Sequence, residues 1–139
     1  MAERDVRRMT VEEFLAWEPE DGERYELVDG LPRAMTGARM KHDRVVRRTM
    51  RALEDRLGDG PCEPFGESIA VRTPRGNVLR PDITVDCGRR PDEATMAEVP
   101  VMIVEVLSRS TESYDLLIKI LEYKSIPTVR HVLFVKPEG

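Results

Sequence analysis

The sequence has few cysteines, no long apolar run and no excess of positive charge. Its two cysteines, Cys62 and Cys87, are too few and too far apart to predict a zinc cage, so we expect free thiols in a reducing compartment. No apolar run approaches the length of a membrane span, and the N-terminus has no apolar signal core. These absences predict a cytoplasmic protein without a membrane segment.

The charge balance is slightly acidic. Lys and Arg number 22 against 26 Asp and Glu, a formal net charge of −4, which argues against a protein that coats nucleic acid by charge alone. Residues 39–51 depart from this balance, because six basic residues meet one acid there. The run includes Arg44, Arg47, Arg48 and Arg51. It predicts either a solvated helix surface or a contact with a phosphate backbone, and both alternatives stay open.

The first half of the chain carries clear signals for helices and a hairpin. A capping box at Thr10 predicts a short first helix, and the dipeptide Asp29-Gly30 predicts a tight hairpin turn. Apolar residues at three- and four-residue spacing predict a long amphipathic helix over about 40–57. With no repeats or internal linker, we expect one domain spanning residues 1–139.

The second half reads as strands around one more helix. "SIAVR" and "NVLRPDITVD" flank the turn "TPRG", a buried run covers 101–107, and "VRHVLFV" is a last strand. A helix is predicted over 111–124. An unbroken apolar run belongs at the centre of a sheet that is covered on both faces. The order of elements predicts an α/β fold with a central mixed β-sheet flanked by helices.

Two of these strands contain an acid within an apolar, β-branched run. Asp82 stands in "RPDITV" and Glu105 in "PVMIVEV". Burying an ionised carboxylate costs several kcal/mol unless a positive group meets it. Neighbouring strands lie about 4.8 Å apart, so the two acids could share a cation, and hard oxygen ligands select Mg²⁺ or Mn²⁺. The alternative is an ion pair with a nearby arginine such as Arg80 or Arg109.

Lys119 lies at the border of the apolar face of the last predicted helix. From there its ammonium can reach over the end of the sheet toward Glu105, where it could orient a water or stabilise negative charge. The alternative is a surface pair with Asp115, one turn earlier.

At these residues the sequence resembles a known family. "RPDITVD" followed by "VPVMIVEVLSRSTESYDLLIKILEYKSIPTVRHVLFV" is similar to a large bacterial family of putative restriction endonucleases, common in cyanobacteria, within the PD-(D/E)XK nuclease superfamily. The upstream "RYELVDG" and His42 match the same family, and the resemblance runs from about Thr10 to Val135. It implies a restriction-endonuclease-like fold and magnesium-dependent hydrolysis of phosphodiester bonds in DNA.

The resemblance also implies roles for single residues. Asp82 would be the first metal ligand and Glu105 the second. The superfamily's simplest pattern has a lysine two residues after the second acid, where this chain has Leu107, so Lys119 would replace it. Glu26 would be an additional acid at the site and His42 a further polar member. The implied catalytic residues are therefore Asp82, Glu105, Lys119, Glu26 and His42.

Some expectations concern alternatives and assembly. Glu67 is an alternative to Glu26 as an inward-pointing acid. Members of the family usually continue with further strands beyond the segment "HVLFVKPEG", so we expect either a shortened member or a missing part supplied by a partner, and hence a homodimer. The alternative function is a catalytically inactive module of the same fold that binds nucleic acid or protein.

Overall fold

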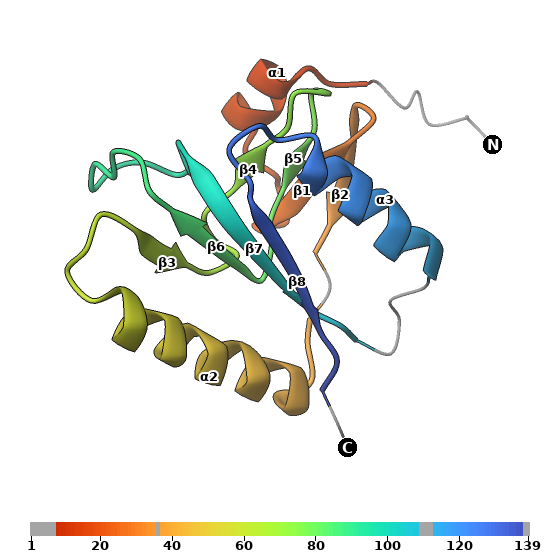
Figure 1. Cartoon of the computed structure of the whole chain (residues 1–139). Coiled ribbons are helices and arrows are strands. Elements are labelled where there is room, and N and C mark those ends of the chain that lie inside the picture. The colour runs from red at the N-terminus through yellow and green to blue at the C-terminus, as the bar shows by residue number, and fades with distance from the viewer. Residues whose placement is uncertain (1–7, 36, 109–112, 138–139) are drawn as a thin grey trace.

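The computed structural model describes residues 8–35, 37–108 and 113–137, and Figure 1 shows the arrangement of their helices and strands. The elements are, in chain order, α1 (Val11–Ala16), β1 (Tyr25–Val28), β2 (Leu31–Ala34), α2 (Met40–Leu57), β3 (Glu63–Phe65), β4 (Val71–Arg72), β5 (Val78–Leu79), β6 (Ile83–Asp86), β7 (Pro100–Val106), α3 (Ser113–Lys124) and β8 (His131–Val135). Within the described residues, no helix combines the length and the apolar character needed to cross a bilayer.

The first sheet has four strands in the order β2-β1-β5-β4, and all its pairs are antiparallel. Side chains alternate between its faces. Leu27 of β1 and Val78 of β5 pair with each other and pack against Val11 and Phe14 of α1. Glu26 therefore lies on the opposite face of β1, which is turned toward the rest of the molecule.

The second sheet has four strands in the order β3-β6-β7-β8. The pair β7 and β8 is parallel and the other pairs are antiparallel, so this sheet is mixed. α2 packs along β3 and β7 (Figure 1). A second core cluster joins Ile103 of β7 and Tyr123 of α3 to Val71 and Leu79 of the first sheet. The predicted α/β class with a mixed sheet and flanking helices is confirmed, and the strands divide into two sheets.

Several local predictions are confirmed. The Thr10 side chain accepts a hydrogen bond from the Glu13 backbone while the Glu13 side chain accepts one from the Thr10 backbone, which is the predicted capping box. Asp29 and Gly30 both have positive φ angles, 52° and 77°, as the predicted two-residue turn requires. α2 spans Met40–Leu57 and is followed by Gly58, also at positive φ.

Other predictions differ from the structure. The run "NVLRPDITVD" forms two strands in different sheets, because β5 ends at Leu79 and β6 begins only at Ile83. The short strand β3 lies in "CEPF", where the sequence carries a proline and no apolar alternation. For the helix predicted over 111–124, α3 is described from Ser113, and the first two predicted positions lie outside the described residues.

The prediction of free thiols is wrong for this structure. β3 and β6 pair in antiparallel register, with Glu63 opposite Asp86. The next position outward brings Cys62 opposite Cys87, with Cα atoms 4.1 Å apart, and the two form a disulfide. The two cysteines are 25 residues apart in the chain, and no sequence pattern predicts β3, so this contact could not be expected.

Candidate active site

β6 and β7 bring Asp82 and Glu105 together. Ile83 pairs with Val104 in antiparallel register, so Asp82, just before Ile83, lies opposite Glu105, just after Val104. The Asp82 backbone N–H donates to Glu105 Oε1 at 2.9 Å, and the Val106 backbone N–H donates to Asp82 Oδ2 at 2.7 Å. Each carboxylate thus accepts a hydrogen bond from the backbone of the other acid's strand, and both carboxylates lie at the same end of the sheet.

α3 adds Lys119 to this pair of acids. Its Nζ donates to Glu105 Oε2 at 2.7 Å, while the Lys119 side chain is 33% exposed and that of Glu105 only 9%. The ammonium therefore closes a largely buried ion pair across the gap between α3 and β7. Of the two alternatives from the sequence, the contact with Glu105 is the one the structure has, and not a surface pair with Asp115.

The start of α2 contributes His42. Its Nε2 lies 2.8 Å from the Val106 carbonyl oxygen and 3.3 Å from Asp82 Oδ2. Because a carbonyl oxygen only accepts hydrogen bonds, Nε2 carries the proton and donates it. His42 thereby links the first turns of α2 to the end of β7 and to Asp82. His42 is not the cap of this helix, since the N-cap position of α2 is Arg39.

Glu26 reaches the same region from β1. Its Oε2 accepts a hydrogen bond from the Arg80 backbone N–H at 2.7 Å. The Arg80 guanidinium binds the carbonyl oxygens of Tyr25, Glu67 and Ser68 and makes no ion pair with Asp82. The ion pair between Asp82 and Arg80 that the sequence allowed is therefore absent from the described residues, and Arg109 lies outside them.

Burial and mutual repulsion set the electrostatics of this cluster. Burial raises the pKa of Glu105; Lys119 opposes this shift and the charge of Asp82 adds to it. Burial likewise raises the pKa of Glu26, against the hydrogen bond from Arg80 and the charge of Lys119. Burial alone would lower the pKa of Lys119, but the attraction of Glu105, Glu26 and Asp82 outweighs it and the pKa is raised. The ammonium form of Lys119 is therefore the stable one at neutral pH.

The donor set suits a hard divalent cation held by two carboxylates. Glu26, Asp82 and Glu105 bring three carboxylates near one ammonium group, so the acids outnumber the bases in this cluster and further positive charge would be favourable. No set of three or more His, Cys, Asp or Glu side chains with metal-binding spacing occurs among the described residues. Mg²⁺ commonly takes one or two carboxylates and keeps several waters, so Asp82 and Glu105 fit that ion.

The basic residues of α2 lie away from these acids. Arg44, Arg47, Arg48 and Arg51 are all exposed. At 100° per residue they occupy one arc, opposite the half-buried apolar arc that packs toward the sheet. Arg47 Nε pairs with Asp43 Oδ2 at 3.1 Å. These arginines form the outer face of α2, which we call the basic face.

The alternative acid, Glu67, does not join the cluster. Its carboxylate is exposed and pairs with Arg24 at 3.1 Å. Glu26, rather than Glu67, is the acid from this part of the chain that points inward.

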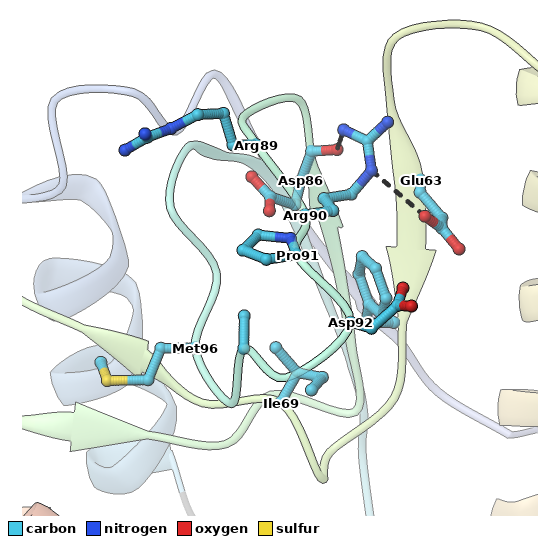
Figure 2. A pocket seen from close by; sticks show the side chains of 10 residues that line it. Glu63, Ile69, Asp86, Arg89, Arg90, Pro91, Asp92 and Met96 are labelled. Carbon is cyan, nitrogen blue, oxygen red and sulfur yellow. Dashed lines mark hydrogen bonds and ion pairs between the residues drawn. The ribbon is translucent and has the colours of Figure 1, made fainter.

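A separate hollow of about 220 Å³ lies beside β3 and β6 and is shown in Figure 2. Four of its charged residues, Glu63, Asp86, Arg89 and Arg90, make hydrogen bonds or ion pairs with other protein groups. The Arg90 guanidinium binds Glu63 and the carbonyl oxygens of Pro61 and Gly88. Asp86 accepts hydrogen bonds from the backbone of Gly88 and Val99. This hollow is a structural junction, and the acids with raised pKa values lie elsewhere.

Comparison with known proteins places these residues in context. The family model described as "Putative restriction endonuclease", Uma2, matches residues 11–139. An uncharacterized protein of Synechocystis sp. is 32% identical over 130 residues, which cover 92% of this chain and 68% of that protein. A crystal structure described as a putative nuclease of DUF820, from Anabaena variabilis, matches with a TM-score of 0.75 at 20% identity over 93% of this chain and 74% of that one. The chain therefore belongs to the Uma2 family of putative restriction endonucleases.

Proposed function

We propose that this protein is a magnesium-dependent DNA endonuclease that hydrolyses phosphodiester bonds, with Mn²⁺ as a substitute ion. The observation that carries the proposal is the joint arrangement of Asp82, Glu105 and Lys119. Glu105 accepts the Asp82 backbone N–H on one oxygen and the Lys119 ammonium on the other. Family membership supports a nuclease-like activity.

Asp82 and Glu105 would hold the ion. A bound Mg²⁺ would supply Lewis-acid polarisation of a phosphoryl oxygen and a more acidic water. The protein's own groups would orient and stabilise the substrate around it. His42, through Nε2–H, would keep Asp82 and the end of β7 in place, since this nitrogen is occupied as a donor and is not available as a base.

Lys119 would act as a fixed positive charge. Because its pKa is raised, it carries its proton at neutral pH and would not serve as a general base. An ammonium 2.7 Å from a metal-binding carboxylate is suited to stabilise the negative charge that develops on a phosphate in the transition state. Glu26 would add negative charge that keeps this lysine protonated.

The experiment combines Mg²⁺ titration calorimetry with cleavage of supercoiled plasmid. Asp82→Ala should abolish both Mg²⁺ binding and cleavage, whereas Asp55→Ala, an exposed acid of α2, should change neither. Wild-type protein that neither binds Mg²⁺ nor cleaves DNA would refute the proposal.

The alternative function is an inactive module of the same fold that binds nucleic acid or protein. The observation favouring it is that Lys119 already neutralises Glu105 within the protein. DNA binding that persists unchanged in Asp82→Ala, with no cleavage by the wild type, would support this alternative.

We further propose that DNA phosphates contact the basic face of α2. All four arginines are exposed and share one arc of the helix. Arg48→Glu with Arg51→Glu should weaken DNA binding and reduce its salt slope by roughly one unit per lost contact, without altering Mg²⁺ binding. An unchanged slope would show that the face is only solvated.

The homodimer, the cytoplasmic location and the single-domain organisation remain predictions. Sedimentation at micromolar protein concentration tests the homodimer.

A further inference from the structure

Tyr123 is a fully buried tyrosine whose hydroxyl oxygen has no hydrogen-bond partner among the described residues. An unpaired buried hydroxyl destabilises the folded state, because it has lost its hydrogen bonds to water and gained none in the protein. Phenylalanine would fill the same space without this cost. The ring packs in the core cluster with Ile103 of β7, so the side chain is held firmly while its polar end is left unused.

The surroundings of this hydroxyl are the candidate active site. Tyr123 follows Lys119 by one helical turn, so both side chains leave the same side of α3. Burial raises the pKa of Tyr123 well above its ordinary value, and the charges of Glu105, Glu26 and Asp82 raise it further. The geometry agrees with this: Tyr123 clusters with Ile103, whose side chain is on the same face of β7 as that of Glu105, and Lys119, one turn earlier on α3, binds Glu105.

Glu105 has room for another donor. Its Oε1 accepts from the Asp82 backbone and its Oε2 from Lys119, one hydrogen bond each. A carboxylate offers about four acceptor sites. An additional donor would fix the orientation of this carboxylate, as the hydrogen-bond partners of metal ligands do.

We propose that Tyr123 is a positioning residue: when a divalent cation binds, its hydroxyl, unpaired in the metal-free protein, donates a hydrogen bond to the Glu105 carboxylate and, together with Lys119, orients it toward the cation. This inference rests on the proposed function, because it assigns to Glu105 the role of metal ligand. It adds a residue to which the sequence by itself assigned no role.

The test is Mg²⁺ titration calorimetry of the full chain, with Tyr123→Phe as the variant. Replacing a residue that hydrogen-bonds to a metal ligand typically weakens metal affinity by about 10-fold or more. We therefore expect the dissociation constant for Mg²⁺ to rise roughly tenfold in Tyr123→Phe. The melting temperature of the metal-free variant should be unchanged or higher, since an unpaired hydroxyl is removed. In the wild type, Mg²⁺ should also perturb the near-ultraviolet tyrosine absorption, and this signal should vanish in Tyr123→Phe but persist in Tyr25→Phe.

Thr84→Val is the matched control. Thr84 is the other residue in the described chain with a buried side-chain atom lacking a hydrogen-bond partner, and it lies on β6 opposite Ile103. This control should bind Mg²⁺ as the wild type does. Equal Mg²⁺ affinity in Tyr123→Phe and wild type, or an equal loss in Thr84→Val, would overturn the inference while leaving the proposed function intact. Absence of Mg²⁺ binding in the wild type would refute both.

Discussion

Replacing Lys119 by methionine tests whether its ion pair with Glu105 is a main electrostatic support of the candidate active site. The variant keeps the length of the side chain and removes the ammonium that lies 2.7 Å from Glu105 Oε2. Breaking a fully buried pair costs about 3–5 kcal/mol because the remaining charge is stranded. Lys119 is 33% exposed, so solvent screens part of this effect and we expect a loss of about 2 kcal/mol at pH 7.5.

The loss should depend on pH with a definite sign. The folded-state pKa of Glu105 is raised, so the folded protein binds this proton more tightly than the unfolded chain, and stability falls as pH rises from the unfolded pKa through the folded one. Removing the attraction of Lys119 raises the folded-state pKa of Glu105 further, so the pH range over which ionisation of Glu105 destabilises the protein extends to higher pH. The deficit of Lys119→Met should therefore be smaller at lower pH, because protonation of Glu105 removes the unpaired buried charge.

Thermal unfolding followed by circular dichroism at pH 5 and pH 7.5 measures both quantities. At roughly 4 °C per kcal/mol for a domain of this size, the melting temperature should drop by about 8 °C at the higher pH. Lys124→Met, an exposed lysine at the end of the same helix, is the matched control and should leave the melting temperature unchanged. An equal loss at both pH values would refute the assignment of the effect to the Glu105 charge.

Other regions give three further predictions. Glu122→Ala should destabilise the protein by about 2–3 kcal/mol in urea unfolding, because its buried carboxylate accepts the side-chain donors of the β4–β5 turn; Glu122→Gln, which keeps an acceptor oxygen, should lose less, and equal losses would contradict this. Reducing the bond between Cys62 and Cys87 should cost about 3 kcal/mol, since it closes a loop of 25 residues; a melting temperature insensitive to dithiothreitol would argue against it. Because burial raises the folded-state pKa of Glu26, ionising this acid destabilises the folded protein as the pH rises above the ordinary glutamate pKa. Glu26→Gln cannot ionise and should therefore lose less stability over this pH range than the wild type. The same pH profile of stability in both proteins would contradict this cause.

Local signals were predictable because they depend on neighbouring residues. The capping box at Thr10, the Asp29-Gly30 turn and the end of α2 at Gly58 each follow from backbone geometry within a few positions. The unbroken apolar run around Glu105 likewise made this acid a candidate for burial in a central strand.

Contacts between distant elements were less accessible. β3 is three residues long and carries no periodic pattern, so neither its pairing with β6 nor the disulfide at its end could be inferred. The division of "NVLRPDITVD" between two sheets depends on where β1 and β7 offer free edges, which is a property of the assembled sheets.

The sequence by itself determined the α/β class, the main helices and turns and the acids worth examining, because periodicity, capping and burial of charge are local properties. Only the tertiary structure decided that Lys119 pairs with Glu105 rather than Asp115, that His42 contacts the end of β7, and that the Tyr123 hydroxyl is left unpaired beside these acids. Each of these depends on how α2 and α3 are placed against the sheet. That placement results from core packing among residues far apart in the chain, and no short stretch of sequence encodes it.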